Sequence, residues 1–171
     1  LSSGTKWVKQ TNTLGATGNT GAIGPVGSAG ISLLWETTTG NSNQGSGKMW
    51  GNNSTFSSIS ELRISDVDKN GANIEAWIQS LDDSTNTALR GTIYIEEEGA
   101  NANFGVFNVN GAVIDGTSYW RIPVAHVASA VGSLADGDSV NTLFSRTGNK
   151  GADGEDGDGT GDMNDVIDDT T

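Results

Sequence analysis

The strongest constraint on this chain is a glycine at every third position between Leu14 and Ile31. The run includes, without a miss, Gly15, Gly18, Gly21, Gly24, Gly27 and Gly30. This is the period of a collagen triple helix, whose crowded axis admits only glycine once per triplet. Residues 14–30 are therefore predicted to wind together with two further copies of the chain, which makes the expected functional unit a homotrimer.

A second, shorter run follows towards the C-terminal end and then loses the period. Its glycines are Gly148, Gly151, Gly154 and Gly157. Lys150 and Asp153 lie one triplet apart, so we expect an exposed interchain ion pair between them, worth about 0.2–1 kcal/mol. We assign residues 148–161 to a second collagen-like segment and residues 162–171 to an acidic linker.

Proline is scarce, with two residues in the whole chain, so the predicted triple helix lacks the stiffening that proline provides. A neighbouring domain must then hold the three strands in register. The alternative for residues 14–30 is a flexible glycine-rich linker, although six consecutive glycines at period three disfavour it. Residues 1–13 hold one short apolar patch and are predicted to be the end of a preceding domain or a linker.

Residues 31–147 have the composition of a β domain. Apolar alternation and recurring turn signals predict strands over 31–37, 48–53, 54–65, 87–98, 102–111, 117–127 and 138–146. The spacing of Ile74, Trp77, Ile78 and Leu81 predicts one short amphipathic helix, with Asn73 as its cap. This pattern predicts an antiparallel β-sandwich or jelly roll. The segment is long enough for a single core.

Charge and composition exclude several kinds of partner. The net charge is −12, and both nucleic acid and anionic membranes need a basic patch. No apolar run approaches the roughly 20 residues that span a bilayer, so we expect no membrane insertion. The chain has no cysteine and therefore no disulfide.

The sequence offers little for catalysis. His126 is the only histidine, which excludes a site built on two histidines of one chain, and no G-x-S-x-G turn is present. We therefore expect no enzymatic activity and place His126 at a turn or edge. The domain tryptophans are Trp35, Trp50, Trp77 and Trp120. At strand and helix positions they are expected to pack in the core, with stacking on sugars as the alternative.

The sharpest local motif is Asp66-x-Asp68-x-Asn70-Gly71. It matches the first half of a calcium loop, in which alternate oxygens point inward and glycine makes the turn. Position 77, where the bidentate acid would stand, is Trp77. Two hypotheses stay open: a Ca²⁺ site on Asp66, Asp68 and Asn70, or an Asn-Gly turn with solvated acids. We expect no other cofactor.

The stretch from Gly15 to Met163 resembles a repeat module of bacteriophage tail-fibre proteins. The resemblance rests on the phrases "SISELRISDVDKNGANIEAWIQSLDDS", "RGTIYI", "NFGVFNVNG", "YWRIPVAHV" and "FSRTGNKGADGEDGDGTGDM". In addition, "GTKWV" near the start is similar to the end of small carbohydrate-binding modules that precede collagen runs in such proteins. The resemblance implies a homotrimeric fibre outside a virion, with other tail proteins as partners and no catalytic residues.

Two functions from different classes follow as hypotheses. The first is a structural virion protein, a segment of a trimeric phage tail fibre that spaces and positions host-recognition elements. The second is a receptor-binding module that grips a host surface glycan through Tyr119 or a tryptophan. A capsid fibre or a bacterial surface filament of the same architecture is a further alternative to the tail fibre.

Overall fold

The computed structural model describes residues 30–151. Among the predicted triple-helix glycines, this range contains Gly30, Gly148 and Gly151, and the others lie outside it. The acidic linker and the segment 1–13 also lie outside it, as does Asp153, so its ion pair with Lys150 stays a prediction.

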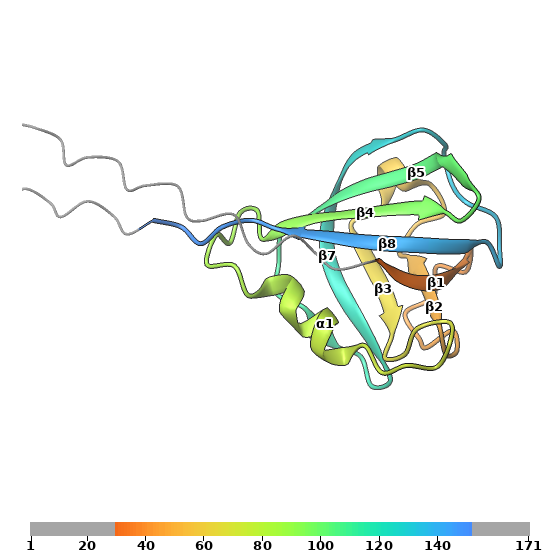
Figure 1. The fold of residues 1–171 in the computed structure, drawn as a ribbon, viewed down its shortest axis with the longest axis horizontal. Helices are drawn as coiled ribbons and strands as arrows, with labels where there is room; N and C mark the ends of the chain where they lie inside the picture. The colour runs from red at the N-terminus through yellow and green to blue at the C-terminus, as the bar shows by residue number, and fades with distance from the viewer. Residues whose placement is uncertain (1–29, 152–171) are drawn as a thin grey trace, which may run out of the picture. The chain divides into compact units, whose positions relative to one another are not determined.

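The described domain is mostly β, with one short α-helix, as the sequence predicts (Figure 1). The strands are β1 (Ile31–Glu36), β2 (Lys48–Gly51), β3 (Glu61–Ser65), β4 (Gly91–Glu97), β5 (Ala100–Val109), β6 (Ile114–Asp115), β7 (Tyr119–Ser129) and β8 (Ser139–Arg146). The helix α1 (Glu75–Gln79) continues into a 3₁₀ turn, η2 (Ser80–Asp82). A second 3₁₀ turn, η1 (Phe56–Ser58), replaces part of the strand expected over 54–65.

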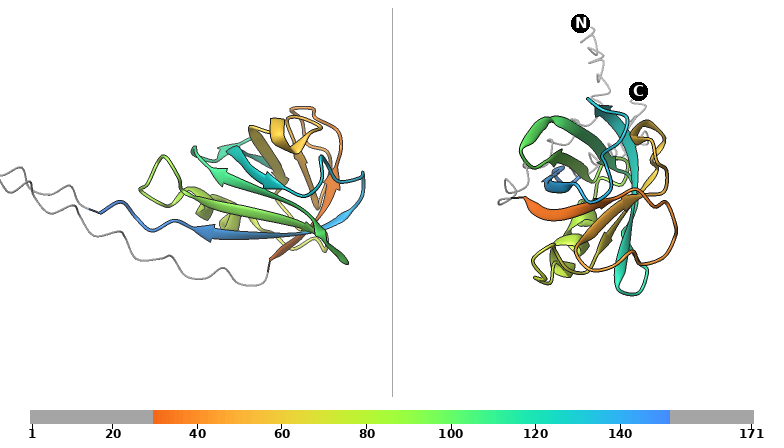
Figure 2. Two further views of the ribbon diagram at one scale, coloured as in Figure 1. Left: turned by 90° about the horizontal axis from the view of Figure 1, so that it is seen from above. Right: turned by 90° about the vertical axis from the view of Figure 1, so that its right-hand side faces the viewer.

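The expectation of a two-sheet sandwich or jelly roll is wrong. The strands form one sheet in the order β3-β2-β1-β8-β4-β5-β7-β6, and β3 also pairs with β7. That pairing closes the sheet on itself, so that it curls into a barrel (Figure 2). Closure arises because β7 is long: its first half pairs with β3, and its second half pairs with β5. A closed sheet leaves few unpaired edges.

The expectation of a purely antiparallel sheet also needs correction. Strands β1 and β2 pair in parallel, with Trp35 opposite Met49. Parallel neighbours need a connection that returns from the end of one strand to the start of the next. Residues 37–47 make this return, and they cross the outside of the barrel to do so.

The barrel is filled by the inward side chains of its strands. On β4, Ile93 and Ile95 are fully buried, and Phe107 of β5 lies opposite Ile93. A chain of edge-on ring contacts joins Trp35, Phe56 and Phe107, with centroids 5.2 and 5.6 Å apart. The core therefore follows the period-two alternation that the sequence shows.

The predicted helix is present, and it packs its apolar side into the core through Ile78 and Leu81, both fully buried. Asn73 lies just before it, and its Oδ1 accepts a hydrogen bond from the Glu75 backbone N–H at 3.1 Å. The helix cap is nevertheless Ile74 and not Asn73 as predicted, and Ile74 makes no side-chain capping hydrogen bond. Asn73, one residue earlier, still satisfies one of the free N–H groups at the start of the helix.

Candidate functional site

The first and last strands of the domain lie side by side. β1 and β8 pair antiparallel, with Ile31 opposite Thr142, so the start of β1 and the end of β8 point towards the same end of the sheet (Figure 1). A Cβ on Gly30 would lie 2.3 Å from Asn141 Oδ1 and 2.9 Å from the Thr142 carbonyl oxygen. The last glycine of the first run is thus packed tightly against β8.

The residues after β8 run along the loop at 84–85. Ser84 Oγ donates to the Gly148 carbonyl oxygen at 3.4 Å, and the Thr85 N–H donates to Asn149 Oδ1 at 3.2 Å. The Lys150 N–H donates to Thr85 Oγ1 at 3.0 Å. The beginning of the second glycine run is therefore anchored to the folded domain.

Two arginines hold that loop in place. Arg146, the last residue of β8, donates to the Ser80 carbonyl oxygen at 3.0 Å and to the Asp83 carboxylate at 2.5 Å. Arg90 donates to the Ser84 carbonyl oxygen at 3.0 Å. These contacts fix the position from which the chain leaves the domain.

The Asp66–Gly71 motif forms a hydrogen-bonded turn. Asp68 Oδ1 accepts from the backbone N–H groups of Ala72 and Asn70, both at 2.8 Å, and these bonds lower the pKa of Asp68. Gly71 has φ +83°, which glycine adopts readily. Within residues 30–151, no cluster of three or more His, Cys, Asp or Glu side chains could hold a metal ion. The calcium site stays a prediction, since Asp68 serves the turn itself.

Asp66 stands apart from that turn. Its Oδ1 is buried without a hydrogen-bond partner. Burial raises the pKa of Asp66, and the nearby charges of Glu75 and Asp115 raise it further. The side chain is therefore less acidic than usual, which does not favour the charged form that a cation ligand requires.

One outward face of the barrel, over β2 and β3, is covered by the 37–47 loop. Trp50 is fully buried there, and its Nε1 donates to the Gly40 carbonyl oxygen at 3.0 Å. Arg63, 6% exposed, donates from Nη1 to the carbonyl oxygens of Thr39 and Gly40, both at 2.8 Å. A buried guanidinium group needs hydrogen-bond acceptors, and the backbone carbonyl groups of the loop supply them for Arg63.

Tyr119 of β7 completes this covered face. Its ring centroid lies 5.5 Å from that of Trp50, and its hydroxyl donates to Asn41 Oδ1 at 3.1 Å. Asn43 donates a hydrogen bond to Ser118 Oγ at 2.8 Å. Ser118 has φ +64°, a backbone conformation that is strained for residues other than glycine. Tyr119 is 6% exposed, so it is not available to stack on a ligand.

Glu61 links two arginines on the same face. It accepts from Arg63 Nε at 2.7 Å and from Arg121 Nη2 at 2.7 Å. Burial alone would raise the pKa of Glu61, but the hydrogen bonds and charges of Arg121 and Arg63 outweigh it and lower the pKa below 4.5. The charges are therefore paired within the fold.

The remaining predicted aromatics belong to the core. Trp35 is 2% exposed, and Trp77 and Trp120 are half-buried against the core cluster. His126 lies on β7, with Nε2 3.1 Å from Ser129 Oγ and its ring edge-on to Phe107. For the three tryptophans these contacts fit the packing that the sequence predicts. The expectation of a turn or edge position for His126 is wrong, because His126 lies within β7 and pairs with Phe107 of β5.

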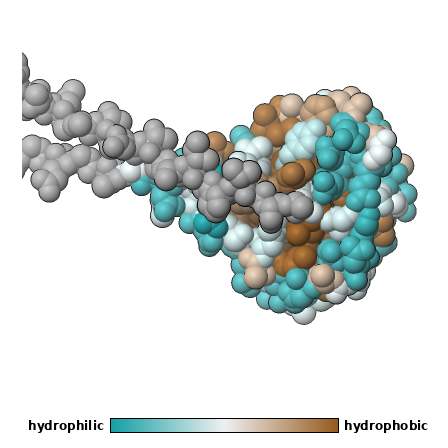
Figure 3. Space-filling view, in the orientation of Figure 1, coloured by the Kyte–Doolittle hydropathy of each residue, from teal (hydrophilic) through white to brown (hydrophobic). Residues whose placement is uncertain are grey.

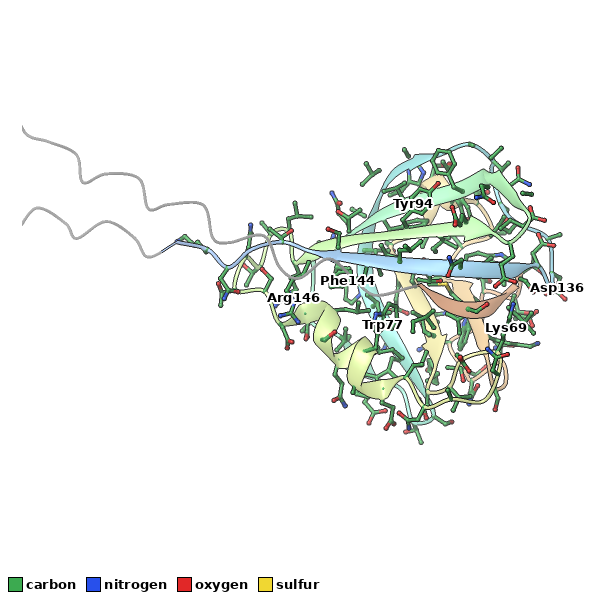
Figure 4. All side chains as sticks on the ribbon, viewed as in Figure 1. Lys69, Trp77, Tyr94, Asp136, Phe144 and Arg146 are labelled. Carbon is green, nitrogen blue, oxygen red and sulfur yellow. The ribbon has the colours of Figure 1, made fainter. Side chains whose placement is uncertain are left out.

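A second outward face, over β4, β5 and β8, carries half-buried apolar side chains. Tyr94 lies opposite Leu143 on one side and Val106 on the other, and its ring stacks on Phe104 with centroids 5.5 Å apart. Apolar surface gathers over this part of the sheet in Figure 3, and Figure 4 labels Tyr94 there. This face was not predicted from the sequence. The available signal was that Tyr94 lies between the buried Ile93 and Ile95, so its side chain must point to the outer side of the sheet.

Comparison of the chain with protein-family models, with curated proteins and with solved structures found no match in any of the three. Over residues 30–151, no helix combines the length and apolar character needed to cross a membrane.

Proposed function

We propose that this chain is a structural segment of a homotrimeric fibre, of the kind found in phage tails, on the outside of a virion. One observation carries the proposal: the folded domain fills the interval between the two glycine runs. Gly30 directly precedes β1, and Gly148 follows the end of β8 at Arg146 by two residues. Such a layout fits a domain inserted between two triple-helical rods, which would space and position host-recognition elements.

The arrangement of β1 and β8 supports such an insertion. Domains whose ends lie close together are readily inserted into another structure. The tight packing of Gly30 on β8 and the anchoring of Gly148 and Lys150 would hold both junctions against one body. In this proposal the domain holds the three chains of each triple helix in register, because the two glycine runs are short and poor in proline. Its partners would be two further copies and other virion proteins.

A glycan-binding role is the weaker alternative. Tyr119, Trp35 and Trp50, three of the aromatics first considered for it, are buried beneath other residues. Trp77 and Trp120 are half-buried against the core, which limits the ring face that a sugar could reach.

The substitution Gly21→Asp in the full chain tests the fibre proposal. It would place a side chain at the triple-helix axis, so we expect the low-temperature melting transition in circular dichroism to vanish while the β-domain transition remains. Ala22→Asp adds the same charge away from the axis and should retain both transitions. If the two variants melt alike, or the wild-type chain has one transition only, the proposal fails.

A further inference from the structure

We propose that the outward face of β4, β5 and β8 is the surface through which three copies of this domain contact one another around the fibre axis. This inference rests on the proposed function, since it takes the partner to be a second copy of the chain. It adds the surface itself, which the glycine runs do not specify.

The face contains an apolar row that crosses four neighbouring strands. In the register of the sheet, Leu143 of β8 lies opposite Tyr94 of β4, Tyr94 lies opposite Val106 of β5, and Val106 lies opposite Ala128 of β7. Val127, beside Ala128 at a bulge, is 52% exposed. Cross-strand neighbours of this kind form a continuous strip, and a strip of apolar side chains on an outer face is a mark of an interface.

The charge pattern of the face fits a contact between identical chains. Each chain carries a net charge of −12, so copies repel unless their contact surfaces are nearly uncharged. Glu96 is the one charged member of the outward set, which comprises Thr92, Tyr94, Glu96, Phe104, Val106, Asn108, Asn141, Leu143 and Ser145. The centres of protein interfaces likewise favour aromatic residues and few charges.

The position of Gly30 identifies the occupant. In a triple helix, three copies of the last glycine lie close to one axis. Gly30 packs against Asn141, whose side chain points outward from β8, two residues before Leu143. Residues close to a threefold axis lie near their own equivalents in the other two copies, so the face next to Gly30 is the one that we expect those copies to meet.

The molar mass of the full chain in solution tests the interface. Leu143→Glu introduces a charge into the apolar row, at its end nearest Gly30, and Ile114→Glu makes the same kind of change at a 42% exposed position on β6. Light scattering after size exclusion should find a trimer for the wild-type chain and for Ile114→Glu. For Leu143→Glu, dissociation should occur at a concentration roughly tenfold higher or more.

The outcomes separate the two proposals. A trimeric wild type with a Leu143→Glu variant that remains equally trimeric overturns the interface and leaves the fibre proposal standing. A monomeric wild type overturns the fibre proposal, and this inference falls with it.

Cross-linking then shows what covers the face. Because the chain has no cysteine, Ser145→Cys offers a single site for a benzophenone label at the exposed edge of the face. Irradiation should give covalent dimers and trimers, whereas the same label on Ser57→Cys, in η1, should give few. Cross-links confined to one chain would show that the chain's own segments cover the face, and would overturn the inference.

Discussion

The two outward faces of the barrel wall differ in what covers them. Over β2, β3 and β7, the 37–47 loop buries Trp50, Arg63 and Tyr119 and supplies their hydrogen-bond partners. On the second face, over β4, β5 and β8 and called the open face below, Tyr94 and Leu143 remain half-buried. The chain's own loop thus covers the first aromatic face, whereas we propose that a second copy of the chain covers the open face.

The cause of the difference is topological. The parallel pairing of β1 and β2 requires a long return connection, and that connection lies over the first face. The second face is built from antiparallel neighbours, two of which are joined by the tight β4–β5 turn at Gly99, φ +84°. A turn as tight as this one cannot reach across the sheet, so the β4–β5 connection itself does not cover the open face.

The largest expected effect comes from removing a buried ring beneath the 37–47 loop on the covered face. Trp50→Ala should lower the free energy of unfolding by about 3–5 kcal/mol, because it removes a fully buried ring and leaves a cavity beneath the loop. Tyr94→Ala on the open face should cost only about 1 kcal/mol. Urea denaturation of the dilute, monomeric chain measures both. Equal losses would contradict the contrast between the faces.

A smaller effect is expected from the charges of the covered face. Glu61→Gln should cost about 1–3 kcal/mol near neutral pH, because it weakens the hydrogen bonds from Arg63 and Arg121.

The pH dependence of that loss has a definite sign. The folded state lowers the pKa of Glu61 below 4.5, so its stabilisation is complete above that value and is lost as the pH falls through the folded pKa. Wild type and Glu61→Gln should therefore converge in acid. Denaturation curves taken at several pH values check this, and a gap that stays constant into acid would argue against the assigned pairing.

The smallest expected effect concerns the stacked pair on the open face. A double-mutant cycle with Tyr94→Ala and Phe104→Ala should give a coupling of about 0.5–1.5 kcal/mol in the dilute chain. If the face is an interface, the apparent stability of wild type should also rise with concentration, and that of the double variant should not. A wild-type melting temperature that does not depend on concentration would argue against an interface on the open face.

Local features of the fold could be predicted from the sequence. Alternation placed most strands within a few residues, and the Asn70-Gly71 turn and the helix at 75–79 were predicted from their own residues. The closure by β3 and β7 and the parallel pairing of β1 with β2 could not be predicted. These are contacts between distant segments, and a strand's own pattern does not specify its neighbour.

The candidate site was less predictable than the fold. The glycan-binding hypothesis needed an exposed Tyr119, yet the polar 37–47 loop buries it. That loop contributes mainly backbone carbonyl groups and an asparagine side chain, which carry no apolar signal. Conversely, Tyr94 and Leu143 align across strands only through the sheet register, which the sequence does not reveal.

Both proposals require that three copies of this chain form one unit. Sedimentation equilibrium of the full, unmodified chain tests it most directly, since it measures mass without reference to shape. One chain has a mass of 17.6 kDa, and we expect three times this mass, with dissociation on dilution. A single-chain mass at all concentrations would contradict both the fibre proposal and the role of the open face.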